Sequence, residues 1–187
     1  MSDNYKNSLA LASALFPNEE WILTEPNIWV AKSRLSQKKR EPEKWKKEMS
    51  QVRILTDRGS MAFFLPERII KGDGLKTADL VLDGEIVEMK TISGSRATLS
   101  GKFKYGYKQG KILLKDCTIT KKHSVYIYLK SDISVGSIKA QIAGNLKNRF
   151  DEGKFICFFE KAGELHTWTY DELRAIIGTG LPTVGEH

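Results

Sequence analysis

An Asp83-Gly84 pair inside residues 76–91 constrains the fold of this chain more than any other feature. The pair separates two short apolar runs. The tight two-residue turn that joins antiparallel strands needs positive φ at both central positions, and aspartate and glycine tolerate that conformation. The stretch therefore predicts a β-hairpin within a larger sheet.

The predicted hairpin brings three reactive side chains near one another. Asp79 begins the first strand, and Glu88 and Lys90 lie on the second. Side chains alternate along a strand, so Glu88 and Lys90 share one face. Carboxylate oxygens suit Mg²⁺, and a lysine can stabilise charge or position the attacking water, which predicts metal-assisted phosphodiester cleavage. Such acid-x-lysine triplets also occur on ordinary solvated strands, and the residues alone leave both interpretations open.

The order of these residues resembles the PD-(D/E)xK nuclease superfamily, which has the restriction-endonuclease-like fold. Residues 64–67, 76–80 and 87–90 resemble more narrowly the C-terminal tRNase domains of contact-dependent growth-inhibition toxins and related phage and mobile-element proteins. The proline that usually precedes the aspartate is Ala78 here. The resemblance covers about residues 45–175.

The resemblance implies nucleic-acid cleavage more firmly than it implies a metal, and one interpretation of it is a metal-dependent active site. Asp79 and Glu88 would bind one or two Mg²⁺ ions, and the backbone carbonyl of Met89 would add a ligand. Lys90 would orient the hydrolytic water or stabilise the pentavalent phosphate.

A metal-independent alternative stays open, because some toxin tRNases of this group have a colicin-like ribonuclease fold in which the same strands are scaffold. Catalysis would then need a general acid and base. His166 is the first candidate and His123 the second, since histidine titrates near neutral pH. Lys90, Thr91 and Arg96 would stabilise the phosphate.

The predicted elements indicate a mixed α/β (α+β) fold with a central, mostly mixed β-sheet flanked by helices, either restriction-endonuclease-like or colicin-like. Apolar residues at helical spacing predict a helix over 42–58. Residues 94–110 are either a helix that crosses the sheet or a mobile basic loop. The remaining predictions are strands at 61–65, 112–114, 125–129, 155–159 and 165–170, a helix over 137–150, and a final helix ending near 178.

The chain is expected to divide into three parts. Residues 1–40 form an N-terminal arm with a helix ending before Pro17 and a possible hairpin. This arm either packs on the main domain or binds a partner. Residues 41–180 form the nuclease domain, and residues 181–187 form a frayed tail.

A net charge of +7 favours a polyanionic partner, and nucleic acid is preferred over a membrane surface. Lysines interleaved with aromatic residues over 102–108 suit an unpaired nucleic-acid strand. The alternative is that Phe103 and Tyr107 form a buried helix face and the lysines are only solvated. The predicted nucleic-acid-binding residues are Arg96, Lys102, Lys104, Tyr105, Lys108 and Lys111.

These features together predict an endonuclease, first of all a toxin-like tRNase that acts on structured RNA. The alternatives are a Mg²⁺-dependent DNA endonuclease of a phage or mobile element and a non-catalytic nucleic-acid-binding module with a nuclease-like fold. The toxin resemblance implies a small acidic immunity protein as partner. No apolar run approaches a membrane span and no ordinary secretory signal begins the chain, so the expected site of action is the cytoplasm.

Overall fold

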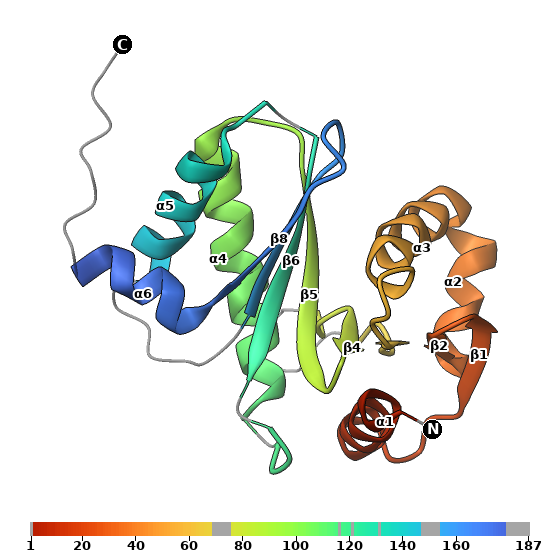
Figure 1. Cartoon of the computed structure of the whole chain (residues 1–187). Coiled ribbons are helices and arrows are strands. Elements are labelled where there is room, and N and C mark those ends of the chain that lie inside the picture. Colours follow the sequence, from red (N-terminus) through yellow and green to blue (C-terminus); the bar gives the residue numbers. More distant parts are fainter. Residues whose placement is uncertain are drawn as a thin grey trace.

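The computed structural model of the protein describes residues 2–68, 76–115, 117–120, 122–130, 132–146 and 154–178. Within these ranges one mixed sheet carries eight strands, which follow one another across the sheet in sequence order (Figure 1). The strands are β1 (Trp21–Glu25), β2 (Ile28–Ala31), β3 (Ala62–Phe64), β4 (Leu80–Leu82), β5 (Glu85–Ile92), β6 (His123–Leu129), β7 (Lys154–Phe159) and β8 (Leu165–Thr169). The helices are α1 (Asp3–Leu15), α2 (Leu35–Arg40), α3 (Pro42–Thr56), α4 (Arg96–Leu113), α5 (Val135–Leu146) and α6 (Tyr170–Gly178), with a short 3-10 helix, η1, at Lys32–Arg34. The expected mixed α/β fold with a mixed central sheet is confirmed.

Parallel strand pairs in this sheet decide where the helices lie. The pairs β2–β3, β5–β6 and β6–β7 are parallel, and the other neighbours are antiparallel. Parallel neighbours need a crossover connection. Helix α3 lies in the first crossover, α4 in the second and α5 in the third. Figure 1 shows α3 on one side of the sheet and α4 and α5 on the other.

The predicted hairpin between β4 and β5 is confirmed. Asp83 and Gly84 both have positive φ, 50° and 83°, and Leu82 pairs with Glu85 across the turn. The turn is also anchored from outside, because Met61 N donates to Asp83 Oδ1 at 2.8 Å. The aspartate therefore serves the turn and the neighbouring strand, as expected for a structural residue.

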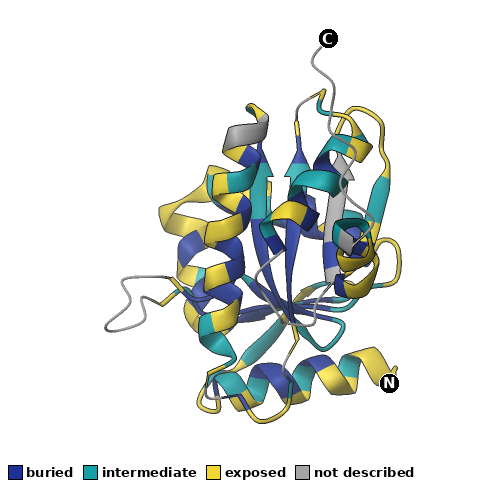
Figure 2. Cartoon of the chain, turned by 90° about the vertical axis from the view of Figure 1, so that its left-hand side faces the viewer, coloured by how far each residue is buried: buried dark blue, intermediate teal, exposed yellow. Residues whose placement is uncertain are grey.

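The two faces of β5 have different environments. Val87 and Met89 belong to a buried apolar cluster with Trp45 of α3. Glu88 and Lys90 project to the opposite face and lie under α4. Figure 2 shows the central strands mostly in dark blue, whereas the outer surfaces of the covering helices are yellow. The predicted alternation of β5 therefore places two ionisable side chains between the sheet and a helix.

The N-terminal segment belongs to the same sheet. Helix α1 ends at Leu15, before Pro17, and β1 and β2 form the expected hairpin. Strand β2 pairs in parallel with β3. Helix α1 packs on Phe63 and Ile86, and its Ser8 Oγ accepts a hydrogen bond from Gly84 N at 2.9 Å. Residues 1–40 thus contribute core contacts and two strands to the sheet that carries β5.

Most of the other expected elements are present, with one error. Helix α3 confirms the helix predicted over 42–58, and the basic segment 94–110 is helical. The strand predicted at 112–114 is wrong, because α4 continues through Leu113 and packs its last turn on the cluster beneath α1. Helix α5 ends at Leu146, and 147–150 and the predicted tail at 181–187 lie outside the described residues.

Alanine substitutions at two glycines of α4 should change the free energy of unfolding in opposite directions. A Cβ on Gly110 would lie 2.7 Å from Nδ1 of the buried His123 ring, whereas a Cβ on Gly101 would meet nothing within 4 Å. Crowding a packed core costs about 1–3 kcal/mol, and alanine gains up to about 1 kcal/mol over glycine in a helix. We expect Gly110→Ala to lower the free energy of unfolding in urea and Gly101→Ala to raise it. Equal effects of the two substitutions would contradict this close packing of α4 on β6.

Candidate active site

The sheet opens beside the second half of β5. Strand β4 begins at Leu80, which pairs with Val87, so among the described residues Met89 and those after it have no strand partner on the β4 side. Asp79 lies where this gap begins, and its Oδ2 accepts a hydrogen bond from Met89 N at 3.0 Å. The N–H and C=O of one strand residue point to the same side, so the carbonyl of Met89 faces the same gap. A carboxylate and a backbone carbonyl therefore meet at an open strand edge.

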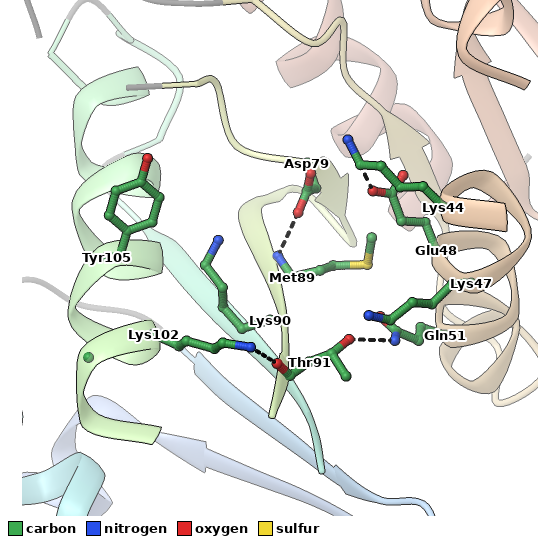
Figure 3. A pocket seen from close by; sticks show the side chains of 11 residues that line it. Lys44, Lys47, Glu48, Gln51, Asp79, Met89, Lys90, Thr91, Lys102 and Tyr105 are labelled. Atoms are coloured by element: carbon green, nitrogen blue, oxygen red, sulfur yellow. Dashed lines mark hydrogen bonds and ion pairs between the residues drawn. The ribbon is translucent and has the colours of Figure 1, made fainter. Parts of the chain in front are cut away.

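A pocket of about 550 Å³ lies at this edge, between α3 and α4. We call it the α3–α4 pocket. Figure 3 shows Lys47 and Gln51 on the α3 side, Lys102 and Tyr105 on the α4 side, and Asp79, Met89 and Lys90 between them. The described residues that line it are Lys44, Lys47, Glu48, Gln51, Asp79, Met89, Lys90, Thr91, Gly101, Lys102 and Tyr105.

Glu88 and Lys90 form an ion pair beside this pocket. Glu88 is only 2% exposed, and its Oε1 contacts Lys90 Nζ. Lys90 Nζ also donates to Gln109 Oε1 of α4 at 2.8 Å. Glu88 Oε2 is buried without a hydrogen-bond partner among the described residues. Gly106 lets α4 approach closely, since a Cβ there would lie 3.2 Å from Glu88 Cγ.

Burial makes the Glu88 carboxyl a weaker acid than an exposed glutamate. Removal from water raises the pKa of Glu88 to about 8, and the charge of Asp79 adds to this effect while Lys90 opposes it. The Glu88 carboxyl therefore holds its proton to a higher pH than an exposed glutamate does. A cation bound beside Glu88 would favour the ionised form of its carboxyl.

The Glu88 carboxyl should make the folded protein less stable as the pH rises. Its pKa is raised above the ordinary 4.5, so between pH 4.5 and 8 the unfolded chain releases a proton that the folded chain keeps. The contribution of Glu88 to the free energy of unfolding therefore falls across this window, by at most about 1.4 kcal/mol per pH unit. We expect urea unfolding in EDTA to show a shallower pH dependence for Glu88→Gln than for the wild type. Glu43→Gln, which changes an exposed carboxylate, is the control; identical slopes for wild type and Glu88→Gln would contradict the prediction.

Arg34 organises the carboxylates of the pocket, and sequence reasoning missed it. The side chain is 1% exposed, and its Nη1 donates to the carbonyls of Leu65 at 2.8 Å and Asp79 at 2.9 Å. Its Nη2 donates to Glu48 Oε2 at 2.9 Å and lies 3.6 Å from Asp79 Oδ1. Arg34 thus ties the start of β4 to α3. No local pattern around residue 34 marks it for this role.

Glu48 and Gln109 were also missed. Burial raises the pKa of Glu48, and the charge of Asp79 adds to the shift while Arg34 opposes it. A signal for Glu48 existed, because this carboxylate interrupts the apolar stripe that Trp45 and Val52 form on α3. Gln109 is buried, and its contact with Lys90 depends on how α4 packs on β5.

The structure brings together most of the residues predicted for metal-assisted cleavage. Asp79, Glu88 and Lys90 converge with the backbone of Met89, and Lys102 and Tyr105 line the same pocket. Lys102 Nζ donates to Thr91 O at 2.6 Å.

Other predicted nucleic-acid contacts lie elsewhere on α4. Lys104, Lys108 and Lys111 are exposed but do not line the pocket, because helical geometry turns them to the side opposite Lys102. The side chain of Arg96 lies outside the described residues. The alternative interpretation of the two aromatic residues is confirmed: Phe103 and Tyr107 are buried.

The histidines proposed for metal-independent catalysis lie away from the pocket. His166 is on β8, three strands from β5, where it stacks on Trp168 and lies 3.1 Å from Glu164 Oε2. His123 is buried under α4 at the start of β6. Neither histidine lines the α3–α4 pocket.

The oxygen donors of the pocket, together with Glu88 beside it, fit Mg²⁺. Within the described ranges, no group of three or more His, Cys, Asp and Glu side chains is spaced to hold a metal ion. Mg²⁺ is usually held by one or two carboxylates and keeps several waters, so it needs no such group. Asp79, Glu88 and the carbonyl of Met89 supply oxygen donors, and the unpartnered Oε2 of Glu88 is available for such a ligand role.

Comparison with known proteins adds no relative to this description. No family model, curated protein or solved structure matches the chain. Among the helices of the described ranges, none is long and apolar enough to cross a membrane. The α3–α4 pocket itself is therefore the basis on which a function can be proposed.

Proposed function

We propose that the protein is a metal-dependent nuclease that hydrolyses phosphodiester bonds in the α3–α4 pocket. The observation that carries this proposal is the convergence of Asp79 with Glu88 and Lys90 at the open edge of β5. Oxygen donors, an ammonium group and lysine-bearing walls meet there in one cavity.

Asp79, Glu88 and the Met89 carbonyl would hold Mg²⁺. When bound, the ion supplies charge stabilisation at the phosphoryl oxygens and makes water more acidic. The ion pair with Arg34 stabilises the position of Asp79, and Asp79 in turn accepts the hydrogen bond from Met89 N. The chain therefore fixes the ligands before the substrate arrives, which is the condition for electrostatic catalysis.

Lys90 is the positive group closest to the acidic pair. Gln109 and Glu88 hold its ammonium group in position. There it would stabilise the extra negative charge of the pentavalent phosphate or orient the attacking water. Lys44, Lys47 and Lys102 line the pocket on both sides and would neutralise the flanking phosphates.

The substrate that we propose first is a structured RNA, with DNA as the alternative. The toxin-domain resemblance supports RNA. Tyr105 is 45% exposed at the pocket, so its ring offers a stacking surface for an unpaired base. Lys90 Nζ lies 5.2 Å from the centroid of this ring. As a toxin, the protein would harm a cell that expresses it alone, and a small acidic immunity protein would neutralise it.

Purified protein incubated with total tRNA and with plasmid DNA, each in Mg²⁺ and in EDTA, tests this proposal. We expect Mg²⁺-dependent cleavage, with faster cleavage of tRNA. Preferred cleavage of the plasmid would identify a DNA endonuclease. Cleavage that survives EDTA would overturn the metal-dependent mechanism, and the absence of cleavage would favour a nucleic-acid-binding module.

A further inference from the structure

Arg34 lines a second, smaller cavity. It has a volume of about 120 Å³ and lies between α2 and the segment that follows β3. Arg34 forms part of its wall while contacting Asp79 and Glu48 of the first pocket. Glu67 also lines the cavity and accepts a hydrogen bond from Lys44 at 2.8 Å. Charged residues of the second cavity therefore pair with charged residues of the α3–α4 pocket.

Gln37 lines this cavity and has an unsatisfied donor. The residue is 1% exposed, and its Oε1 accepts a hydrogen bond from Arg34 Nε at 3.2 Å. That contact fixes the orientation of the amide, because Arg34 can only donate. The buried Nε2 has no acceptor among the described residues. Most buried polar groups are paired, so this amide indicates a missing acceptor.

The charges around Gln37 favour an anionic acceptor. The charge of Arg34 is compensated by Glu48 and Asp79. Burial alone would raise the pKa of Glu67, but hydrogen bonds from Lys44 and Lys76 lower it to about 2. Two further arginines line the cavity. Within the described ranges Arg40 is exposed and has no ion pair, and Arg68 has one ion pair, with Glu19 at 3.9 Å. The cavity therefore has an excess of positive charge.

We propose that this cavity binds a phosphate group. Gln37 Nε2 donates to one phosphate oxygen, and Arg40 and Arg68 neutralise its charge with the planar donors that suit phosphate. With a volume of about 120 Å³, the cavity has room for a group of the size of a tetrahedral oxyanion. The phosphate is either a phosphodiester of a nucleic acid that continues from the α3–α4 pocket or a free phosphate ion.

Calorimetric titration of the full chain with inorganic phosphate, at constant ionic strength in EDTA, tests the site. Gln37→Glu keeps an oxygen for Arg34 Nε and replaces the free donor by a second acceptor. We expect this variant to bind phosphate roughly ten- to a hundredfold more weakly, because a hydrogen bond to a charged group is lost. Arg40→Ala, a surface change, should weaken binding as well, whereas Lys39→Ala on the same helix should not. Absence of saturable binding by the wild type, or wild-type affinity for phosphate in both Gln37→Glu and Arg40→Ala, would overturn the proposal.

The source of the phosphate is distinguished by binding a labelled single-stranded oligonucleotide to the same variants in EDTA. Weaker oligonucleotide binding by Gln37→Glu and Arg40→Ala supports a substrate phosphodiester in the cavity. Unchanged oligonucleotide binding together with weakened phosphate binding supports a free phosphate ion. Neither measurement requires cleavage, so the site stands or fails independently of the proposed nuclease activity.

Discussion

Asp79→Asn is expected to slow phosphodiester cleavage by roughly 10³-fold or more at saturating Mg²⁺, because a preorganised charge at the reacting centre is removed. The asparagine carbonyl oxygen can still accept the hydrogen bond from Met89 N that Asp79 Oδ2 accepts at 3.0 Å. The local backbone is therefore retained while one anionic ligand is lost. Initial rates of cleavage of an end-labelled substrate measure the effect.

Asp132→Asn provides the matched control for this substitution. Asp132 is an exposed carboxylate paired with Lys161 at 2.8 Å, and it does not line the α3–α4 pocket. It should keep the wild-type rate and the wild-type unfolding curve. Retention of most of the cleavage activity by a folded Asp79→Asn protein would contradict the assignment of Asp79 as a ligand.

Arg34→Met should lower the free energy of unfolding by about 3–5 kcal/mol, the range observed when one partner of a buried ion pair is removed. Methionine fills similar space but leaves Glu48 and the carbonyls of Leu65 and Asp79 without their donor. A buried acceptor without a partner keeps the full cost of its lost hydration. Urea unfolding followed by circular dichroism measures the change.

Two comparisons separate this effect from the loss of any arginine. Arg53→Met removes an arginine that is 49% exposed and paired with Glu25, and exposed pairs contribute about 0–1 kcal/mol. Adding Glu48→Gln to Arg34→Met removes the uncompensated charge and should restore part of the stability. If Arg34→Met were no more destabilising than Arg53→Met, the central role of Arg34 in the site would be wrong.

The parts of the fold that the sequence predicts well depend on local chemistry. The Asp83-Gly84 turn needs positive φ, and both residues adopt it. The alternation of Glu88 and Lys90 with the apolar residues of β5 follows from the period of a strand, and the structure has it. Helix α3 follows from the apolar spacing of its core residues.

The prediction is weaker where packing overrides local preference. Helix α4 contains three glycines, yet it runs continuously to Leu113 because Phe103 and Tyr107 bury one face and glycine backbone packs against Glu88 and His123. The sequence therefore left 94–110 undecided and placed a strand at 112–114. Low helix propensity is a weak prior against tertiary contacts of this kind.

The residues of the candidate site also divide into those that local sequence predicts and those that only the packing brings together. Asp79, Glu88 and Lys90 lie close in sequence, so a single hairpin is enough to predict that they meet. Arg34, Glu48 and Gln109 come from η1, α3 and α4, and only the crossover connections bring them to β5. A carboxylate within the apolar stripe of α3 could have indicated Glu48; the other two residues have no comparable local signal.

Binding of Mn²⁺ to the wild-type protein and to Asp79→Asn, measured by calorimetry without nucleic acid, tests most directly whether the acidic pair is a metal site. The proposed mechanism predicts saturable binding by the wild type that Asp79→Asn weakens by at least tenfold, with protons released from Glu88 as the ion binds. Equal binding by the two proteins, or no binding by either, would contradict the proposal that Asp79 and Glu88 hold a divalent cation.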